Sequence, residues 1–193
     1  FINAGALVIA DMLVSHLKHP KEDFLAFIRA ISGTQEIDFN LKVAQSEKDT
    51  GYRNAALANF LKSFGNIEND VEIVLDFYFH QCSIEMTCKE LAHSFYFFAN
   101  EGKTMDRKQI LSKSNVKRLN ALMQTCGFYD ESGEFTYKVG LPGKSGIGGG
   151  IAALFPKHFT IVAWNPRLNE KGNSELGMNA LELFTTKTGM SIF

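Results

Sequence analysis

The chain has 193 residues, the length of one domain, and its 45% hydrophobic content, with 17 Phe, is enough for a buried core. Its formal net charge of −1, without a basic run, argues against nucleic acid as the main partner. No apolar stretch approaches the ~20 residues of a membrane span, and no signal peptide is visible. Cys82, Cys88 and Cys126 follow no metal-ligand spacing, so we expect no metal site and interpret them as reduced, mostly buried thiols of a cytoplasmic protein.

The first two-thirds of the chain shows helical periodicity. Apolar residues recur every three to four positions over 6–17, and Pro20 stops that run. A second helix is expected over 24–31, ended by Gly33. Further helices are expected near 53–64, 68–80, 84–100 and 107–125, the last with Gly127 as its C-cap.

The pattern then changes to short segments rich in β-branched and aromatic residues, separated by Gly and Pro. Strands are predicted over 135–139, 148–154 and 159–164, followed by a helix over 174–187. This order predicts an α+β fold in which helices pack on one antiparallel sheet. Because the chain opens at Phe1 inside an uncapped helical pattern, we expect residues 1–193 to be a single domain truncated at its N-terminus.

The segment 139–151 is the most informative for function. It holds six glycines, Lys144 and Ser145, and it runs directly into an apolar strand. Glycines let backbone N–H groups come close to a ligand, and a positive charge beside such groups suits a developing oxyanion. The Lys-Ser-Gly sequence is also similar to the Lys-Thr/Ser-Gly element of penicillin-binding and β-lactamase-type acyl-transfer enzymes.

Simpler interpretations of this segment compete with the catalytic one. A Walker A loop requires Gly where Lys138 stands, and a dinucleotide-binding frame requires Gly where Ile151 stands. A glycine-rich kink in a strand, with no ligand, stays open as the structural alternative.

Three further regions could carry chemistry. Glu47 and Asn54 are seven residues apart and would share a face if one helix continued through both. A carboxylate and an amide suit the ammonium and carboxylate of an amino-acid head group. A solvated loop between two helices explains the same charged residues. Tyr78 and His80 lie at an aromatic helix end, where a core role is more common. Tyr129 follows a helix in a loop and is a better candidate for proton transfer.

A nucleophile is harder to find. Acyl-transfer enzymes of this kind use Ser-x-x-Lys, in which the lysine can take the serine proton. The two literal matches, 15–18 and 114–117, are expected to face solvent. A literal Lys-Thr-Gly at 187–189 ends a helix, with Gly189 as its C-cap, and leads into no long strand.

Taken together, these segments resemble the serine-dependent glutaminases, a family with the β-lactamase-like fold. The matching segments, in the family's order, are 1–6, Ser46-Glu47 with 53–55, Tyr78 ahead of Cys82-Ser83, 125–130 and 139–150. They span nearly the whole chain, and the ordered set is far more specific than any one of them.

The resemblance implies hydrolysis of L-glutamine to L-glutamate and ammonia through a Ser–Lys pair, without a cofactor. Substrate contacts then fall on Asn3, Glu47, Asn54, Tyr78, Tyr129 and the backbone at Ile147. Tyr129 would be the catalytic proton relay and the Ile147 N–H an oxyanion donor, while Lys144 and Ser145 would shape the site electrostatically. The family usually has Val at the position of Ile147, a harmless change if the backbone acts. It also forms dimers and tetramers, so a homo-oligomer is expected.

One departure from the family pattern is serious. The family's Ser-x-x-Lys lies upstream of the Asn-Ala-Gly-Ala segment, so here it would precede Phe1. We therefore expect the chain alone to be inactive. Two alternatives stay open: a non-catalytic amino-acid-binding or assembly module, and a β-lactamase-like hydrolase of another amide.

Overall fold

The computed structural model describes residues 3–193; Phe1 and Ile2, which open the first segment matching the family, lie outside the described residues. The chain forms two compact units. The helical unit holds the described residues up to Ala30 together with Thr34–Met86, and the sheet unit holds Ile31–Gly33 together with Thr87–Phe193. Within residues 3–193, none of the helices is long and apolar enough to span a membrane.

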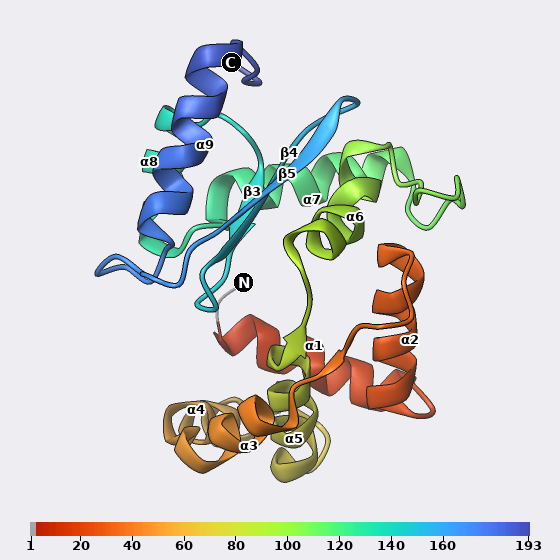
Figure 1. Ribbon diagram of the computed structural model, residues 1–193. Coiled ribbons are helices and arrows are strands. Elements are labelled where there is room, and N and C mark those ends of the chain that lie inside the picture. Colours follow the sequence, from red (N-terminus) through yellow and green to blue (C-terminus); the bar gives the residue numbers. More distant parts are fainter. Residues whose placement is uncertain (1–2) are drawn as a thin grey trace. The chain divides into compact units, whose positions relative to one another are not determined.

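The helical unit is built around one central helix. Its elements are α1 (Asn3–His16), α2 (Pro20–Ser32, whose last two residues belong to the sheet unit), β1 (Asp38–Phe39), α3 (Leu41–Thr50), α4 (Tyr52–Ser63), α5 (Val71–Cys82) and β2 (Ile84–Glu85). Helices α1, α3 and α4 all pack against α5 (Figure 1). The short strands β1 and β2 pair antiparallel, with Phe39 opposite Ile84.

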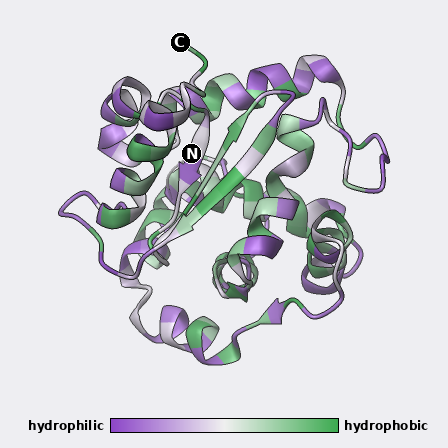
Figure 2. Ribbon diagram, turned by 45° about the horizontal axis from the view of Figure 1, so that its top comes forward, coloured by the Kyte–Doolittle hydropathy of each residue, from purple (hydrophilic) through white to green (hydrophobic). Residues whose placement is uncertain are grey.

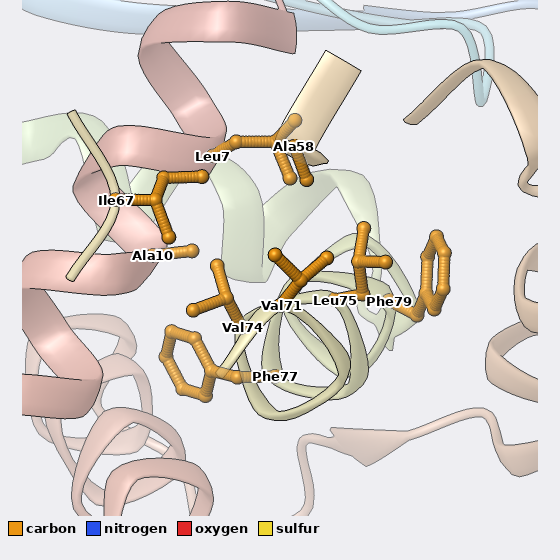
Figure 3. Packing of buried hydrophobic residues seen from close by; sticks show 9 residues of the cluster. All are labelled: Leu7, Ala10, Ala58, Ile67, Val71, Val74, Leu75, Phe77 and Phe79. Carbon is orange, nitrogen blue, oxygen red and sulfur yellow. The ribbon is translucent and has the colours of Figure 1, made fainter. Parts of the chain in front are cut away.

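The core of this unit follows from the spacing of apolar residues on α5. Val71, Val74 and Leu75 lie three and four positions apart, so one face of the helix is apolar and buried. Figure 3 shows these side chains gathered with Leu7 and Ala10 of α1. In the hydropathy view of Figure 2, the helices carry both hydrophilic (purple) and hydrophobic (green) residues.

A buried carboxylate fastens α1 to the segment that precedes α5. Asp11 is only 5% exposed, and its oxygens accept the backbone N–H groups of Glu68 at 3.1 Å and Asn69 at 3.0 Å. Burial alone would raise the pKa of Asp11, but the hydrogen bonds from Asn69 and Glu68 outweigh it and hold that pKa below its usual value.

The sheet unit packs helices on both faces of a three-stranded antiparallel sheet. Its elements are α6 (Cys88–Ala99), α7 (Lys113–Cys126), the 3₁₀ turn η1 (Tyr129–Glu131), α8 (Ser132–Lys138), β3 (Gly143–Ser145), β4 (Gly150–Phe155), β5 (Phe159–Trp164) and α9 (Glu175–Thr188). The strand order is β3-β4-β5, with Lys144 opposite Ala152 and Ala152 opposite Val162. Figure 1 shows α8 and α9 on one face of the sheet and α6 and α7 on the other.

The core of the sheet unit is dominated by a pair of stacked rings. Phe128 and Phe135 are each 1% exposed, and their ring centroids lie 3.6 Å apart. The same cluster includes Ile151 and Ala153 of β4 and Leu181 of α9, so α8 and α9 share one core with the sheet.

The predicted α+β class, with helices on an antiparallel sheet, is confirmed, but the strand predicted over 135–139 is wrong. These residues lie in and just after α8, because Phe135 and Val139, four positions apart, face the core while Tyr137 is 90% exposed. The third strand is instead β3, which carries the Lys-Ser-Gly sequence.

Other differences concern helix boundaries and the cysteines. Helix α7 begins only at Lys113, after a turn in which Arg107 has a φ of 67°. The helix α3 was not predicted; Asn40 caps it by accepting two backbone N–H groups. Pro20 occupies the first position of α2, where its missing N–H costs nothing. The three thiols are free but exposed rather than mostly buried, so that part of the cysteine prediction is wrong.

Candidate active site

Tyr129 sits on a backbone turn that the sheet unit holds tightly. Its φ of 51° lies in the left-handed region, which a non-glycine residue rarely adopts. Just before it, Gly127 ends α7 so close to β3 that a Cβ there would lie 1.9 Å from the carbonyl oxygen of Gly143. The Ser145 N–H also donates to the Gly127 carbonyl at 3.1 Å. The turn with Tyr129 is therefore fixed beside the Lys-Ser-Gly strand.

Lys144 connects that strand to the tyrosine. Its ammonium lies 4.6 Å from the centroid of the Tyr129 ring, a cation–π distance, and donates to the carbonyl of Ser145. Burial lowers the pKa of Lys144 below its usual value, since the charged form is poorly solvated there. Lys144 thus places a partly desolvated positive charge next to the phenol.

The glycine-rich turn between β3 and β4 exposes backbone donors. Gly146 donates to Gly150 at 2.9 Å and Gly149 to Gly146 at 3.0 Å, while the Trp164 indole N–H donates to the Gly148 carbonyl at 2.9 Å. The N–H of Ile147 donates to none of the other described residues, and its side chain is 68% exposed. A rigid turn with an unused N–H is the geometry that an oxyanion donor requires.

A buried carboxylate anchors the segment after β5 next to this turn. Glu131, 7% exposed, accepts the side-chain N–H groups of Asn169 at 3.0 and 2.9 Å and one from Asn173. A Cβ built on Gly172, which lies between these two asparagines, would be 3.9 Å from both the Ile147 and the Tyr129 side chains. The segment 169–173 therefore lines the same surface as Tyr129 and Ile147.

In the helical unit, two predicted residues are in direct contact. The Asn3 side-chain amide donates to the side-chain oxygen Oδ1 of Asn54 at 2.7 Å, which joins the start of α1 to the first turn of α4. Glu47 lies seven residues earlier in the sequence, on α3, and the two helices are separated at Gly51. The continuous helix on which Glu47 and Asn54 would share a face does not form, because α3 ends at Thr50 and α4 begins at Tyr52.

Tyr78 lies on α5, partly buried against the core of the helical unit. Its side chain hydrogen-bonds the thiol of Cys82, on which the Glu47 carboxylate also acts electrostatically. Tyr78 and the charge of Glu47 therefore both act on the Cys82 thiol. Four of the predicted residues thus belong to the helical unit and two, Tyr129 and Ile147, to the sheet unit.

The serines of the two literal Ser-x-x-Lys sequences are both exposed, as predicted. Ser15 donates to the Asp11 carbonyl at 3.0 Å and accepts the Asn69 side chain at 2.7 Å. Ser114 is exposed in the first turn of α7. Gly189, in the literal Lys-Thr-Gly, ends α9 with a φ of 67°, as predicted.

Glu131, Asn169 and Asn173 were not among the predicted site residues. The turn around Gly172, with a φ of 84°, could be anticipated from its Asn and Gly content. The carboxylate that these asparagines bind is about forty positions away in the sequence, and no local pattern connects them.

Solved structures with the same fold indicate the class of protein. The fold matches glutaminases of the β-lactamase-like fold. One of them is a Bacillus subtilis glutaminase, YbgJ, in covalent complex with 5-oxo-L-norleucine, with a TM-score of 0.93 and 34% identity over 100% of this chain and 69% of that one. A second match is Mglu in its glutamate form, with a TM-score of 0.93 and 28% identity, covering 44% of that chain.

The sequence comparisons then give the family. The glutaminase family matches residues 1–193, and the chain belongs to this family. Curated glutaminases of Christiangramia forsetii and Saccharophagus degradans are 58% and 55% identical over 194 residues, which is 100% of this chain. The chain spans 64% and 63% of the length of these two relatives.

Proposed function

We propose that the protein hydrolyses L-glutamine to L-glutamate and ammonia through a Ser–Lys acyl-enzyme, with no cofactor. The single observation that carries the proposal is the conjunction of Tyr129, the Lys144 ammonium and the unused Ile147 N–H on one surface of the sheet unit. A phenol that moves a proton and a backbone donor beside a positive charge suit acyl transfer at an amide carbonyl.

The comparisons support glutamine as the substrate. The Bacillus relative reacts with 6-diazo-5-oxo-L-norleucine to give a covalent complex with 5-oxo-L-norleucine. That compound has an amino-acid head group and a carbonyl carbon at the position of the glutamine amide. For this chain we assign the head group to Asn3, Glu47, Asn54 and Tyr78. Glu47 would take the ammonium, and the amide of Asn54 would donate to the carboxylate.

In this mechanism Tyr129 relays the proton between the serine and the departing ammonia. The Ile147 N–H stabilises the oxyanion of each tetrahedral intermediate, and Lys144 lowers the cost of that negative charge. We further propose that the Ser-x-x-Lys pair lies outside residues 1–193, because both literal matches within them, Ser15 and Ser114, hold structural or exposed positions. The 193-residue chain alone should then release no ammonia above background.

The test uses the full-length product of the gene that carries this sequence. Ammonia release is measured with glutamine and asparagine, ring opening of a β-lactam is followed by its absorbance, and the reacted serine is identified by mass spectrometry after labelling with 6-diazo-5-oxo-L-norleucine. We expect turnover of glutamine and a label on a serine outside residues 1–193. No turnover would favour a non-catalytic binding module. A label on Ser15 or Ser114 would refute the assigned nucleophile.

We also infer a cytoplasmic homo-oligomer. The free thiols of Cys82, Cys88 and Cys126 suit a reducing compartment. At the end of α4, Phe60 and Phe64 are 61% and 67% exposed, and their rings meet edge to face with centroids 5.0 Å apart. This is an apolar surface of the kind that subunits cover. Light scattering should give a mass above that of a monomer, and Phe60→Ser should lower it.

A further inference from the structure

Trp164 reaches from the end of β5 to the turn between β3 and β4. Its side chain is 59% exposed, so burial in the core does not explain its position. The indole N–H donates to the carbonyl of Gly148 at 2.9 Å. Gly148 follows Ile147, whose N–H is the proposed oxyanion donor. One side-chain hydrogen bond therefore ties the strand to the turn that carries this donor.

The turn has the geometry of a three-residue hairpin loop. The Gly146 N–H donates to the Gly150 carbonyl at 2.9 Å, and the Gly149 N–H donates to the Gly146 carbonyl at 3.0 Å. Gly149 closes the loop with a φ of 89°, in the left-handed region that such loops use at this position. Because glycine leaves its own backbone so free, a turn built mostly of glycine needs contacts from outside to keep one conformation.

Two planar peptide units connect the indole to the Ile147 N–H. The Gly148 carbonyl, which accepts the indole N–H, belongs to the same rigid unit as the Gly149 N–H. That N–H donates to the Gly146 carbonyl, which shares a rigid unit with the Ile147 N–H. The carbonyl and the N–H of a trans unit point in opposite directions, so a bond to the first carbonyl restrains the direction of the last N–H. Each bond in such a series also polarises the next, which makes the last N–H a stronger donor.

The end of β5 is held in place, so the indole has a fixed base. Trp164 lies opposite Gly150 in the sheet. The next residue, Asn165, donates its N–H to the Gly149 carbonyl at 3.0 Å, and a Cβ built on Gly149 would lie 2.3 Å from the Asn165 carbonyl oxygen. That oxygen also accepts the hydroxyl of Ser174, just before α9, at 3.1 Å. The backbones of the turn and of the end of β5 are therefore in close contact, and the indole extends that contact one residue further into the turn.

We infer that Trp164 is a positioning residue of the proposed oxyanion site: its indole N–H holds the glycine-rich turn so that the Ile147 N–H points at the oxygen of the substrate carbonyl. The inference rests on the proposed function, because it concerns the donor that this function assigns to Ile147. Trp164 acts through the turn and needs no contact with the substrate. Loss of its N–H should therefore slow the step in which the oxyanion forms and leave substrate binding nearly unchanged.

Two variants of the full-length gene product separate the N–H from the rest of the ring. Trp164→Phe keeps an aromatic ring and removes the donor. Trp164→His lacks the second ring but keeps a donor, because its Nε2 occupies the same place in a five-membered ring as the indole Nε1. We expect Trp164→Phe to lower kcat for glutamine roughly 10-fold, less than the ~10²-fold loss of an oxyanion donor itself, with KM within ~2-fold. Trp164→His should recover kcat to within ~3-fold of the parent protein.

Thr160→Val is the matched control on the same strand. The Thr160 hydroxyl donates to the carbonyl of Ala92, on α6, at 3.0 Å, so this variant also removes a side-chain hydrogen bond from β5 to a backbone carbonyl. That bond does not reach the turn. Its loss should lower Tm about as much as Trp164→Phe does, while kcat stays that of the parent protein.

Hydrogen exchange tests the hold on the turn without turnover. The Gly149 amide is protected by its bond to the Gly146 carbonyl, and it exchanges when the turn opens. Its exchange rate, measured by mass spectrometry with electron-transfer fragmentation, should rise roughly 10-fold in Trp164→Phe and stay near the parental rate in Trp164→His and Thr160→Val. A parent protein that does not hydrolyse glutamine would refute the proposed function, whereas exchange would still decide whether Trp164 holds the turn.

Several results would overturn the inference. Parental kcat or parental exchange at Gly149 in Trp164→Phe would mean that the indole N–H does not hold the turn. A lower kcat in Trp164→His than in Trp164→Phe would follow the size of the ring and indicate packing. A raised KM with normal kcat would make Trp164 a substrate contact. If Trp164→Phe does not fold, 3-benzothienylalanine at this position, which keeps the shape of the indole and lacks only its N–H, carries the same expectations.

Discussion

The two units present their candidate residues in different ways. In the helical unit, Asn3, Glu47 and Tyr78 are side chains on regular helices. In the sheet unit, Tyr129 stands on a left-handed turn, and Ile147 contributes its backbone from a glycine-rich turn. In the proposed site, the helices would supply groups that recognise the substrate, whereas the irregular backbone would supply groups that must be held at a fixed point. Substitutions should therefore affect substrate recognition in the first unit and turnover in the second.

The largest effect is expected for Tyr129→Phe in the full-length gene product. The ring and its contact with Lys144 stay, so the free energy of unfolding should change by no more than ~1 kcal/mol for one hydrogen bond. Without the hydroxyl, kcat should fall by ~10²-fold or more, on the scale of acid–base catalysis, while KM for glutamine changes much less. Tyr137→Phe, at a 90% exposed position, is the control. A lower Tm with normal kcat would make Tyr129 a packing residue.

Glu47→Gln tests recognition in the helical unit. If Glu47 takes the substrate ammonium as proposed, removing its charge should lower kcat/KM for glutamine by roughly 10- to 100-fold, the scale of a charged hydrogen bond of ~1.5–3 kcal/mol. Asp49→Asn is the matched control, because Asp49 is an exposed carboxylate on the same helix, bonded to Gln45 at 2.7 Å. Equal kinetics in the two variants would return Glu47 to the role of a surface charge.

Glu131→Gln tests whether the buried carboxylate holds the surface around Tyr129. A glutamine cannot accept all the N–H groups that Asn169 and Asn173 offer, so segment 169–173 should loosen. We expect a stability loss of ~1–3 kcal/mol from the unpaired groups and a fall in kcat of roughly 10-fold from misplacement. Glu134→Gln is the control: its partly exposed pair with Lys138 at 2.8 Å contributes little. Normal kcat with reduced stability would limit Glu131 to a structural role.

Lys144 should set part of the pH dependence. Burial lowers its pKa, so the charge is lost at lower pH than in an ordinary lysine, and turnover should decline on the alkaline side as it is lost. The unfolded chain holds that proton more tightly, so the contribution of Lys144 to stability rises with pH between the two pKa values. Lys144→Arg keeps the charge at all these pH values, so the alkaline decline in the pH profile of kcat should move to higher pH. If the alkaline decline of kcat stays at the same pH in this variant, the decline belongs to another titrating group.

The sequence alone predicted the elements that depend on the spacing of neighbouring apolar residues. The α5 helix follows from apolar residues three and four positions apart, and β4 and β5 from continuous apolar segments. The mistaken strand over 135–139 shows the limit, because β-branched and aromatic residues also suit a short helix when Phe135 and Val139 can both reach the core.

Tertiary contacts determine most of the site geometry that the sequence did not predict. The left-handed φ of Tyr129 depends on the close approach of Gly127 to β3, and the Glu131 contacts join segments about forty residues apart. The exposure of the Ile147 N–H depends on how the turn closes, which the glycines permit but do not specify. The motifs therefore identified candidate residues, while their geometry came from the fold.

The smallest effect is expected for Ile147→Val, which sharpens the contrast between backbone and side-chain chemistry. Both residues are β-branched and favour similar backbone conformations, and the lost methyl group is mostly solvent-exposed, so no cavity forms. If the N–H is the working group, kcat/KM should stay within about 2-fold, far below the ~10²-fold effect of removing an oxyanion donor. Ile147→Pro removes that N–H at the same position and should lose roughly 10²- to 10³-fold in kcat, with folding checked by circular dichroism. A large loss in the valine variant would mean that the side chain itself contacts the substrate.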